Sequence, residues 1–303
     1  MDLSASIELD PAQLAAWAKE AAAKAAQGQV NTRISLLAQS DPAWFAAQIM
    51  TREGTWSWGD TERVFPLMSV VKPFLLLYLL EHCGQEQVFR WVGMTPSDAP
   101  FNSLEQLIAD GGWPRNPMIN SGAIALSAHL AEASQDATGH LCSWLNQQAG
   151  CDLRLDEDLL ASVRQAGREP NQALLKVLVQ AGQVQHSEAA LDAYERACCL
   201  SGRIEDLAKL GKLLTFEQAV AYQHRCTVNA LMLTCGLYEA SSASAVRVGL
   251  PLKSGISGAL LAVVPGWGAI AAYSPALDSV GNPVAALAWV KQLAQGLRLS
   301  VFG

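Results

Sequence analysis

Residues 254–277 read SGISGALLAVVPGWGAIAAYSPAL, and they decide the fold because the whole stretch carries no charged residue. A membrane-spanning helix needs about 20 mainly apolar residues, so a transmembrane span is one interpretation. Glycine and proline interrupt the stretch repeatedly, however, and these residues punctuate strands and turns more often than spanning helices. We therefore interpret it as two buried strands, Ala259–Val264 and Ala269–Ser274, joined by a Pro-Gly-Trp-Gly turn.

The segments at both ends of the chain predict partners for this hairpin. Residues 283–297 predict a closing helix. Near the start, Asp10-Pro11 pairs an N-cap residue with proline at the first helical position, which predicts a helix to Ala26 that Gly28 stops. The mixture of Trp, Phe and Thr in 42–68 predicts two short antiparallel strands, roughly 44–50 and 55–58.

The middle of the chain, about 85–220, is predicted to be mostly helical, with loops at 94–103, 109–118 and 166–170. The order of elements gives an α/β (α+β) fold, an antiparallel sheet flanked by helices with an inserted all-helical subdomain. We expect residues 1–68 and 225–303 to form the sheet-and-helix subdomain. Residues 69–224 would form the helical subdomain, and the two together would make one catalytic unit.

Composition narrows the class of protein. Of the 303 residues, 50% are hydrophobic and 16% are charged, which excludes a disordered chain. The net charge of −7 and the lack of a basic block disfavour nucleic acid as a partner. No CxxC, HxxxH or HExxH spacing occurs, so we expect neither a disulfide framework nor a metal site. The start, MDLSASIELD, lacks the features of a signal peptide, which predicts a cytoplasmic location and no membrane partner.

Ser69-Val70-Val71-Lys72 is the first candidate for catalysis. Residues three apart share a face of a helix, so Lys72 could remove the Ser69 proton that a serine nucleophile must lose. Apolar neighbours would lower the pKa of Lys72 and keep the amine neutral. Pro73 requires the helix to start near Ser69. Chance predicts about 0.6 SxxK matches in this chain, so the alternative is a core helix whose lysine reaches the surface.

Three more segments carry candidate groups. Lys253-Ser254-Gly255 lies before a strand, a position typical of serine acyl-transfer enzymes, although a plain turn into a strand is commoner. Tyr238 could relay protons to a leaving group, or be an ordinary half-buried tyrosine. Asn120 could present its amide to a ligand, or act as the N-cap of the helix that follows.

Taken together, the chain resembles the serine-dependent glutaminase family, whose fold is that of serine β-lactamases and penicillin-binding proteins. The resemblance runs from about Gly28 to Leu293, and its most diagnostic stretch is Asn116 to Ile124. It also includes the segments Gly59-Asp60-Thr61, Ser69–Lys72, Pro100-Phe101-Asn102-Ser103, Leu191-Asp192-Ala193-Tyr194, Cys235-Gly236-Leu237-Tyr238, Val248–Gly255, Ser274-Pro275 and Gly281-Asn282.

The resemblance implies a role for each matching residue. Ser69 would be the nucleophile, Lys72 its general base, and Tyr238 the proton donor to departing ammonia. The remaining roles concern the substrate: the backbone N–H groups of Ser69 and Ile256 would form the oxyanion hole, and Asn120, Asn171 and Tyr194 would hold the amino-acid end of glutamine. The family also implies an amidohydrolase that releases glutamate and ammonia without a cofactor, acts on a small-molecule amide and forms a homo-oligomer.

Two residues depart from the family pattern at the substrate end. Arg33 stands where a tyrosine is expected, and Arg164 stands where a glutamate would pair with the α-amino group of glutamine. A third departure, Gly122 in place of alanine, is mild. Like charges in a closed site cost on the order of several kcal/mol. The hypothesis is therefore that free glutamine is a poor substrate and that the two arginines suit a dianionic or N-acylated one. In the alternative, Arg164 faces solvent and an acid such as Glu169 takes over.

Three functions remain open at this stage. The first is a glutaminase, the second a Ser–Lys hydrolase of another amide or ester, and the third a non-catalytic relative that retains the fold. Intact Ser69, Lys72, Tyr238 and Lys253 argue against the third, and the two arginines argue against the plain first.

Overall fold

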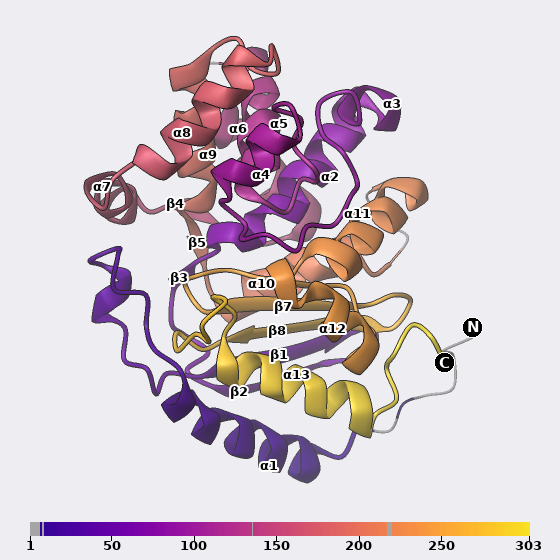
Figure 1. Ribbon diagram of the computed structural model, residues 1–303. Coiled ribbons are helices and arrows are strands. Elements are labelled where there is room, and N and C mark those ends of the chain that lie inside the picture. The colour runs from indigo at the N-terminus through magenta and orange to yellow at the C-terminus, as the bar shows by residue number, and fades with distance from the viewer. Residues whose placement is uncertain (1–6, 8, 135, 217–219) are drawn as a thin grey trace.

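A five-stranded antiparallel sheet lies between the helices α1 (Pro11–Ala22) and α13 (Val284–Gly296) on one side and the remaining helical layer on the other (Figure 1). The computed structural model describes residues 7, 9–134, 136–216 and 220–303. The strands are β1 (Ala46–Thr51), β2 (Thr55–Gly59), β6 (Leu252–Ser254), β7 (Ala259–Val264) and β8 (Gly268–Tyr273), in the order β2-β1-β8-β7-β6. The pairing of β1 with β8 joins the two ends of the chain in one sheet, with Ala46 opposite Tyr273. The predicted hairpin and N-terminal strands are confirmed.

The central strands are buried on both faces because each face is covered by a different layer. On β7, Leu260 and Val264 pack with α1 (Pro11–Ala22) and α13 (Val284–Gly296), while Leu261 and Val263 turn to the opposite core. This alternation follows from the two-residue period of a strand. It explains how an uncharged stretch forms a hairpin that is buried between two layers of the protein. Within the described residues no helix is long and apolar enough to cross a bilayer.

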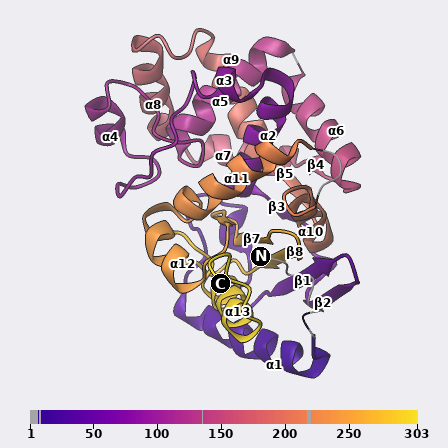
Figure 2. The same cartoon turned by 90° about the vertical axis from the view of Figure 1, so that its right-hand side faces the viewer.

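The opposite face carries α10 (Ile204–Leu213) and, beyond it, a layer of helices (Figure 2). Gly211 lets α10 approach the sheet closely, since a Cβ there would lie 2.6 Å from the Ala269 Cβ atom. α10 thus belongs to the packing of the sheet although it falls within the range 69–224. The other helices of this layer are α2 (Lys72–Cys83), α3 (Gln85–Val88), α4 (Leu104–Ala109), α5 (Asn120–Ala133), α6 (Ala137–Ala149), α7 (Glu157–Gln165), α8 (Glu169–Gln180), α9 (Ser187–Cys198) and α11 (Tyr222–Cys235). The short helix α12 (Ser241–Arg247) follows α11 and lies beside the sheet.

Several helix ends differ from the sequence-based expectation. The first helix is capped by the Asp10 side chain as predicted, but its last turn continues as a 3-10 helix, Ala23–Gln27. The predicted loop 166–170 is shorter, because α8 already begins at Glu169 and tolerates Pro170 in its first turn. Proline is compatible with that position because the first N–H groups of a helix have no helical partner.

A small three-stranded sheet, absent from the sequence-based expectation, ties the two layers together. It consists of β3 (Phe65–Pro66), β5 (Leu200–Gly202) and β4 (Arg154–Leu155), in the order β3-β5-β4. The Leu67 N–H continues the ladder by donating to the Leu200 carbonyl over 2.8 Å. This sheet therefore holds the segment that precedes Ser69 next to the C-terminal end of α9.

Candidate active site

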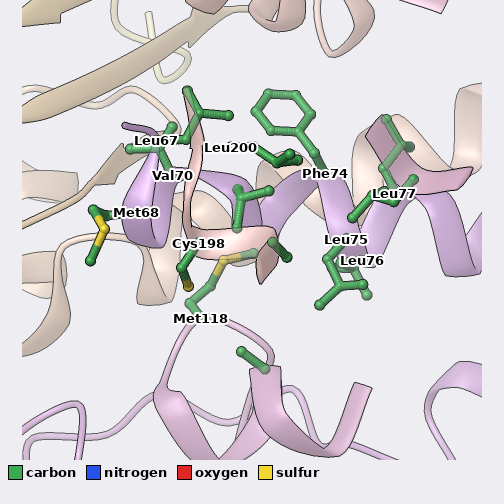
Figure 3. Packing of buried hydrophobic residues seen from close by; sticks show 14 of the residues in the cluster. Leu67, Met68, Val70, Phe74, Leu75, Leu76, Leu77, Met118, Cys198 and Leu200 are labelled. Atoms are coloured by element: carbon green, nitrogen blue, oxygen red, sulfur yellow. The ribbon is translucent and has the colours of Figure 1, made fainter. Parts of the chain in front are cut away.

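Ser69 lies at the entrance to α2, as the position of Pro73 predicts. A 3-10 helix, Met68–Val71, runs directly into the α-helix that starts at Lys72. Met68 adopts a positive φ of 46°, a conformation that non-glycine residues hold only where the surroundings enforce it. Figure 3 shows the enforcing environment: Leu67, Val70 and Phe74 point into a close-packed apolar cluster around this segment.

Lys72 is almost completely buried, with 1% of its surface exposed. Burial lowers the pKa of its amine to about 8, although the nearby Cys198 acts in the opposite direction. The Nζ atom donates to the Asn120 side-chain carbonyl over 2.7 Å and to the Met118 carbonyl over 3.3 Å. A neutral amine has two N–H groups and one lone pair. These two acceptors occupy both N–H groups and leave the lone pair available.

Asn120 connects this lysine to the neighbouring helices. The N-cap of α5 is Ile119, which makes no side-chain cap bond, so the interpretation of Asn120 as a helix cap is wrong. Its amide instead accepts from Lys72 and donates to the Asn171 side-chain carbonyl over 3.0 Å. One asparagine thus orients the base from one end and a residue of α8 from the other.

Tyr238 approaches Ser69 from the sheet side. It begins a 3-10 turn with a φ of 58°, is buried, and shares a hydrogen bond with the Ser69 side chain. Its hydroxyl also donates to the Ser254 carbonyl over 3.4 Å. Burial raises the pKa of Tyr238 to about 12, although the hydrogen bond with Ser69 works against that rise. The phenol therefore keeps its proton next to the serine at neutral pH.

Lys253 packs against the ring of Tyr238. Its Nζ atom lies 4.5 Å from the centre of the Tyr238 ring and donates to the carbonyls of Gly236 and Ser254 over 3.0 and 2.7 Å. Burial holds the pKa of Lys253 well below its ordinary value, and Lys72 lowers it further. Lys253 and Ser254 lie on the edge strand β6, so this motif is part of the sheet and not merely a turn leading into it.

The turn after β6 is packed against the serine segment. A Cβ on Gly255 would lie 2.7 Å from the Leu67 carbonyl oxygen and 3.3 Å from the Ser69 nitrogen. The Ser257 hydroxyl donates to the Pro66 carbonyl over 2.7 Å. These contacts hold Ile256 beside Ser69, so that two backbone N–H groups can serve one oxyanion.

These groups open onto a cavity of about 250 Å³. Most of the predicted substrate-binding residues meet there; the lining is Asn31, Arg33, Ile34, Met68, Ser69, Phe101, Asn102, Asn120, Val163, Ala166, Gly167, Pro170, Asn171, Tyr194, Glu195, Cys198 and Ile256. A larger hollow of about 570 Å³ lies over β4 and β5, away from Ser69. In the described part of the chain, no group of His, Cys, Asp and Glu is arranged to hold a metal ion.

Arg164 is not among the residues that line this cavity. Its guanidinium pairs with the carboxylates of Asp192 and Glu195, the latter over 3.1 Å from Nε to Oε2. Glu169 does not take over either, because it is exposed and absent from the lining. The acid that reaches the cavity is Glu195 of α9. The family pattern predicted a cation in the cavity, but the Arg164 side chain on α7 is directed toward the carboxylates of α9.

Glu195 and Cys198 are cavity residues that the sequence reasoning missed. A signal was present: Leu191, Tyr194, Glu195 and Cys198 recur at helical spacing, and all four are buried. An acid on the buried stripe of a helix is unusual enough to mark it as a candidate. Burial raises the pKa of the Cys198 thiol to about 11, although Lys72 and Tyr194 lower it.

Known proteins are similar to this chain in sequence and in overall fold. The family model described as Glutaminase matches residues 28–302. A glutaminase of Synechocystis sp. is 43% identical over 284 residues, which cover 92% of this chain and 87% of that protein. The solved structure of the probable glutaminase ybaS is 32% identical with a TM-score of 0.88, covering 97% of this chain and 99% of that one. A probable glutaminase from Bacillus subtilis, complexed with 6-diazo-5-oxo-L-norleucine, is 27% identical with a TM-score of 0.86, covering 97% of each chain.

Proposed function

Since the chain belongs to the glutaminase family, we propose that it hydrolyses the side-chain amide of L-glutamine to L-glutamate and ammonia. The observation that carries the proposal is the arrangement at Ser69, where a buried amine with a free lone pair lies one helical turn away and a protonated phenol shares a hydrogen bond with the serine. Acyl transfer through a serine needs both a base and an acid of this kind.

In the first half-reaction, the Ser69 oxygen attacks the side-chain carbonyl carbon and its proton passes to the Lys72 amine. The tetrahedral oxyanion accepts hydrogen bonds from the backbone N–H groups of Ser69 and Ile256. The C–N bond then breaks, Tyr238 gives its proton to the departing nitrogen, and the products are ammonia and a glutamyl ester of Ser69. Lys72 returns its proton to the Tyr238 oxygen.

In the second half-reaction, water attacks the glutamyl ester and the neutral Lys72 accepts the water proton. Collapse of this second tetrahedral intermediate releases L-glutamate and leaves the Ser69 oxygen, which recovers the proton from Lys72. What supports the direction of proton flow is the pair of pKa values: about 8 for Lys72, far enough below the usual lysine value that part of the amine is free near neutrality and most of it above pH 8, and about 12 for Tyr238, which favours the phenol.

The cavity offers room for a small amino acid and is lined by amide and hydroxyl groups. Asn120, Asn171 and Tyr194 lie on three different helices, so they can hold several polar atoms of one substrate in a fixed orientation. A cytoplasmic location and self-association of the chain stay predictions from the sequence.

The test is ammonia release from L-glutamine by the purified protein, with Ser69→Ala as the variant and Ser127→Ala as a matched control. Ser127 is also a buried serine on a helix, but it does not line the cavity. Robust release that only Ser69→Ala abolishes supports the proposal. A folded protein that releases no ammonia from L-glutamine contradicts the proposal. Hydrolysis of other amides or esters would then identify a Ser–Lys hydrolase that acts on a different substrate.

A further inference from the structure

Among the residues that the structure describes, one acidic and one basic side chain line the cavity around Ser69. They are Glu195, which is 2% exposed, and Arg33, which is exposed. The two other titratable groups of the helical wall, Tyr194 and Cys198, are held neutral near pH 7 because burial raises their pKa values. An amino acid presents one ammonium and one carboxylate at its α-carbon. The cavity therefore offers one charge of each sign to a ligand that carries one of each.

Two arginines hold the Glu195 carboxylate in place, and it keeps free hydrogen-bond acceptor positions. Its Oε1 accepts from the Arg168 Nε over 2.7 Å, and its Oε2 accepts from the Arg164 Nε over 3.1 Å. A carboxylate has about four acceptor positions, so each oxygen keeps one for another donor. The two arginines are themselves shared with Asp192 and Glu188 at the surface. The ion pairs thus orient a buried carboxylate from α7 and from the N-cap of α8, and each carboxylate oxygen keeps an acceptor position for a ligand in the cavity.

Hydrogen bonds hold both the backbone and the side chain of Arg33 at the cavity. The Asn31 side chain accepts from the N–H groups of Arg33 and Ile34, each over 3.1 Å, which fixes the turn that carries it. One guanidinium nitrogen, Nη2, donates to the Gly167 carbonyl over 2.8 Å. A guanidinium has five N–H donors in a planar fork, so most remain available for a carboxylate.

We infer that Glu195 binds the α-ammonium group of the substrate and that Arg33 binds its α-carboxylate, so that this pair selects a free α-amino acid amide. The inference rests on the proposed function and names the part of the substrate that the site recognises. Arg164 and Arg168 are positioning residues, because they act on the ligand only through the Glu195 carboxylate.

The test compares L-glutamine with N-acetyl-L-glutamine, which lacks the ammonium, and with L-glutamine α-amide, which lacks the carboxylate. The product is identified chromatographically. The protein should prefer L-glutamine over both by about 10- to 100-fold in kcat/KM, as expected for losing one charge-assisted hydrogen bond. Equal or better turnover of N-acetyl-L-glutamine would overturn the inference and favour an N-acylated substrate.

Variants separate recognition from support of the fold. Glu195→Gln keeps the size and the acceptor oxygen but loses the charge, so it should raise KM for L-glutamine and leave N-acetyl-L-glutamine unaffected. Arg33→Gln should erase the preference over the α-amide. Glu188→Gln is the matched control, because Glu188 lies on the same helix and also pairs with Arg168 but is exposed and outside the cavity. An equal loss with all three substrates in Glu195→Gln would assign Glu195 a purely structural role and overturn the inference.

A binding measurement keeps the inference testable if turnover fails. In the Ser69→Ala background, calorimetry should show tighter binding of L-glutamine than of N-acetyl-L-glutamine, and Glu195→Gln should remove the difference. Binding with this pattern but without hydrolysis would contradict the proposed function alone. Hydrolysis of L-glutamine with no effect of Glu195→Gln on the substrate preference would contradict the inference alone.

Discussion

The Lys72 amine donates to the Asn120 side-chain carbonyl over 2.7 Å, and this contact links the base to the substrate cavity. Lys72 itself does not line the cavity, whereas Asn120 does. A ligand that binds Asn120 therefore acts on the base through a single side chain. Binding of substrate and orientation of the lysine lone pair are coupled at this position.

The first prediction concerns pH. Burial lowers the pKa of Lys72 to about 8, and only the neutral amine can accept the serine proton. Protonation at lower pH therefore removes the base, so kcat/KM should fall about tenfold for each pH unit below that value and level off above it. Initial rates of ammonia release between pH 5.5 and 9.5 measure this. A flat profile across pH 6 to 8 would contradict the role of Lys72.

The second prediction tests the contact between Asn120 and Lys72. Asn120→Asp places a carboxylate next to the ammonium form, which stabilises the charge and raises the pKa of the lysine. The acidic limb of the pH profile should move upward by about one to two units. Asn146→Asp is the control, since Asn146 bonds to the Leu153 carbonyl on the far side of the helical layer and lies outside the cavity. Equal shifts in both variants would show that the contact does not matter.

The third prediction concerns the proton donor. Tyr238→Phe keeps the ring over Lys253 but removes the hydroxyl that meets Ser69. Loss of a positioned acid costs about 10²- to 10⁴-fold in rate, so kcat should drop by that factor while the melting temperature stays nearly unchanged. Tyr222→Phe, at a surface tyrosine that is 64% exposed, should have no effect on kcat. A Tyr238→Phe variant with full activity would exclude the phenol as the acid.

The fourth prediction separates the site from the fold. Gly255→Ala forces a Cβ to within 2.7 Å of the Leu67 carbonyl, so it should displace the turn that carries Ile256 and reduce kcat. Gly211→Ala creates a comparable clash between α10 and the sheet, 2.6 Å from the Ala269 Cβ atom. It should lower the melting temperature with a smaller effect on kcat of the protein that remains folded. Paired thermal melts and initial rates check the contrast, and the opposite ranking would contradict it.

Local patterns predicted much of the fold and the reacting groups. The strand β7 has its predicted bounds because Pro265 and Gly266 end it, and the start of α2 follows from the position of Pro73. Such features depend on a few neighbouring residues, so a single sequence contains them.

The remaining features depend on pairing between distant segments. The strands β3, β4 and β5 have two or three residues each, too few to show a period, and they exist only because they meet. Asn120 has the local pattern of a helix cap, but the buried amine of Lys72 offers it a stronger partner. Arg164 was assigned to the substrate by its place in the family pattern, and only the approach of α7 to α9 shows that it pairs with Glu195.

The most direct test of the central claim is covalent labelling of Ser69. A glutamine analogue with an electrophilic carbon at the position of the side-chain amide, such as 6-diazo-5-oxo-L-norleucine, should react with the nucleophile of this site. Intact-mass and peptide analysis should find one adduct per chain, located on Ser69, slowed by L-glutamine and absent from Ser69→Ala. An adduct on Cys198 or another residue, or no adduct on a folded protein, would contradict the assignment of Ser69 as the nucleophile of a glutaminase.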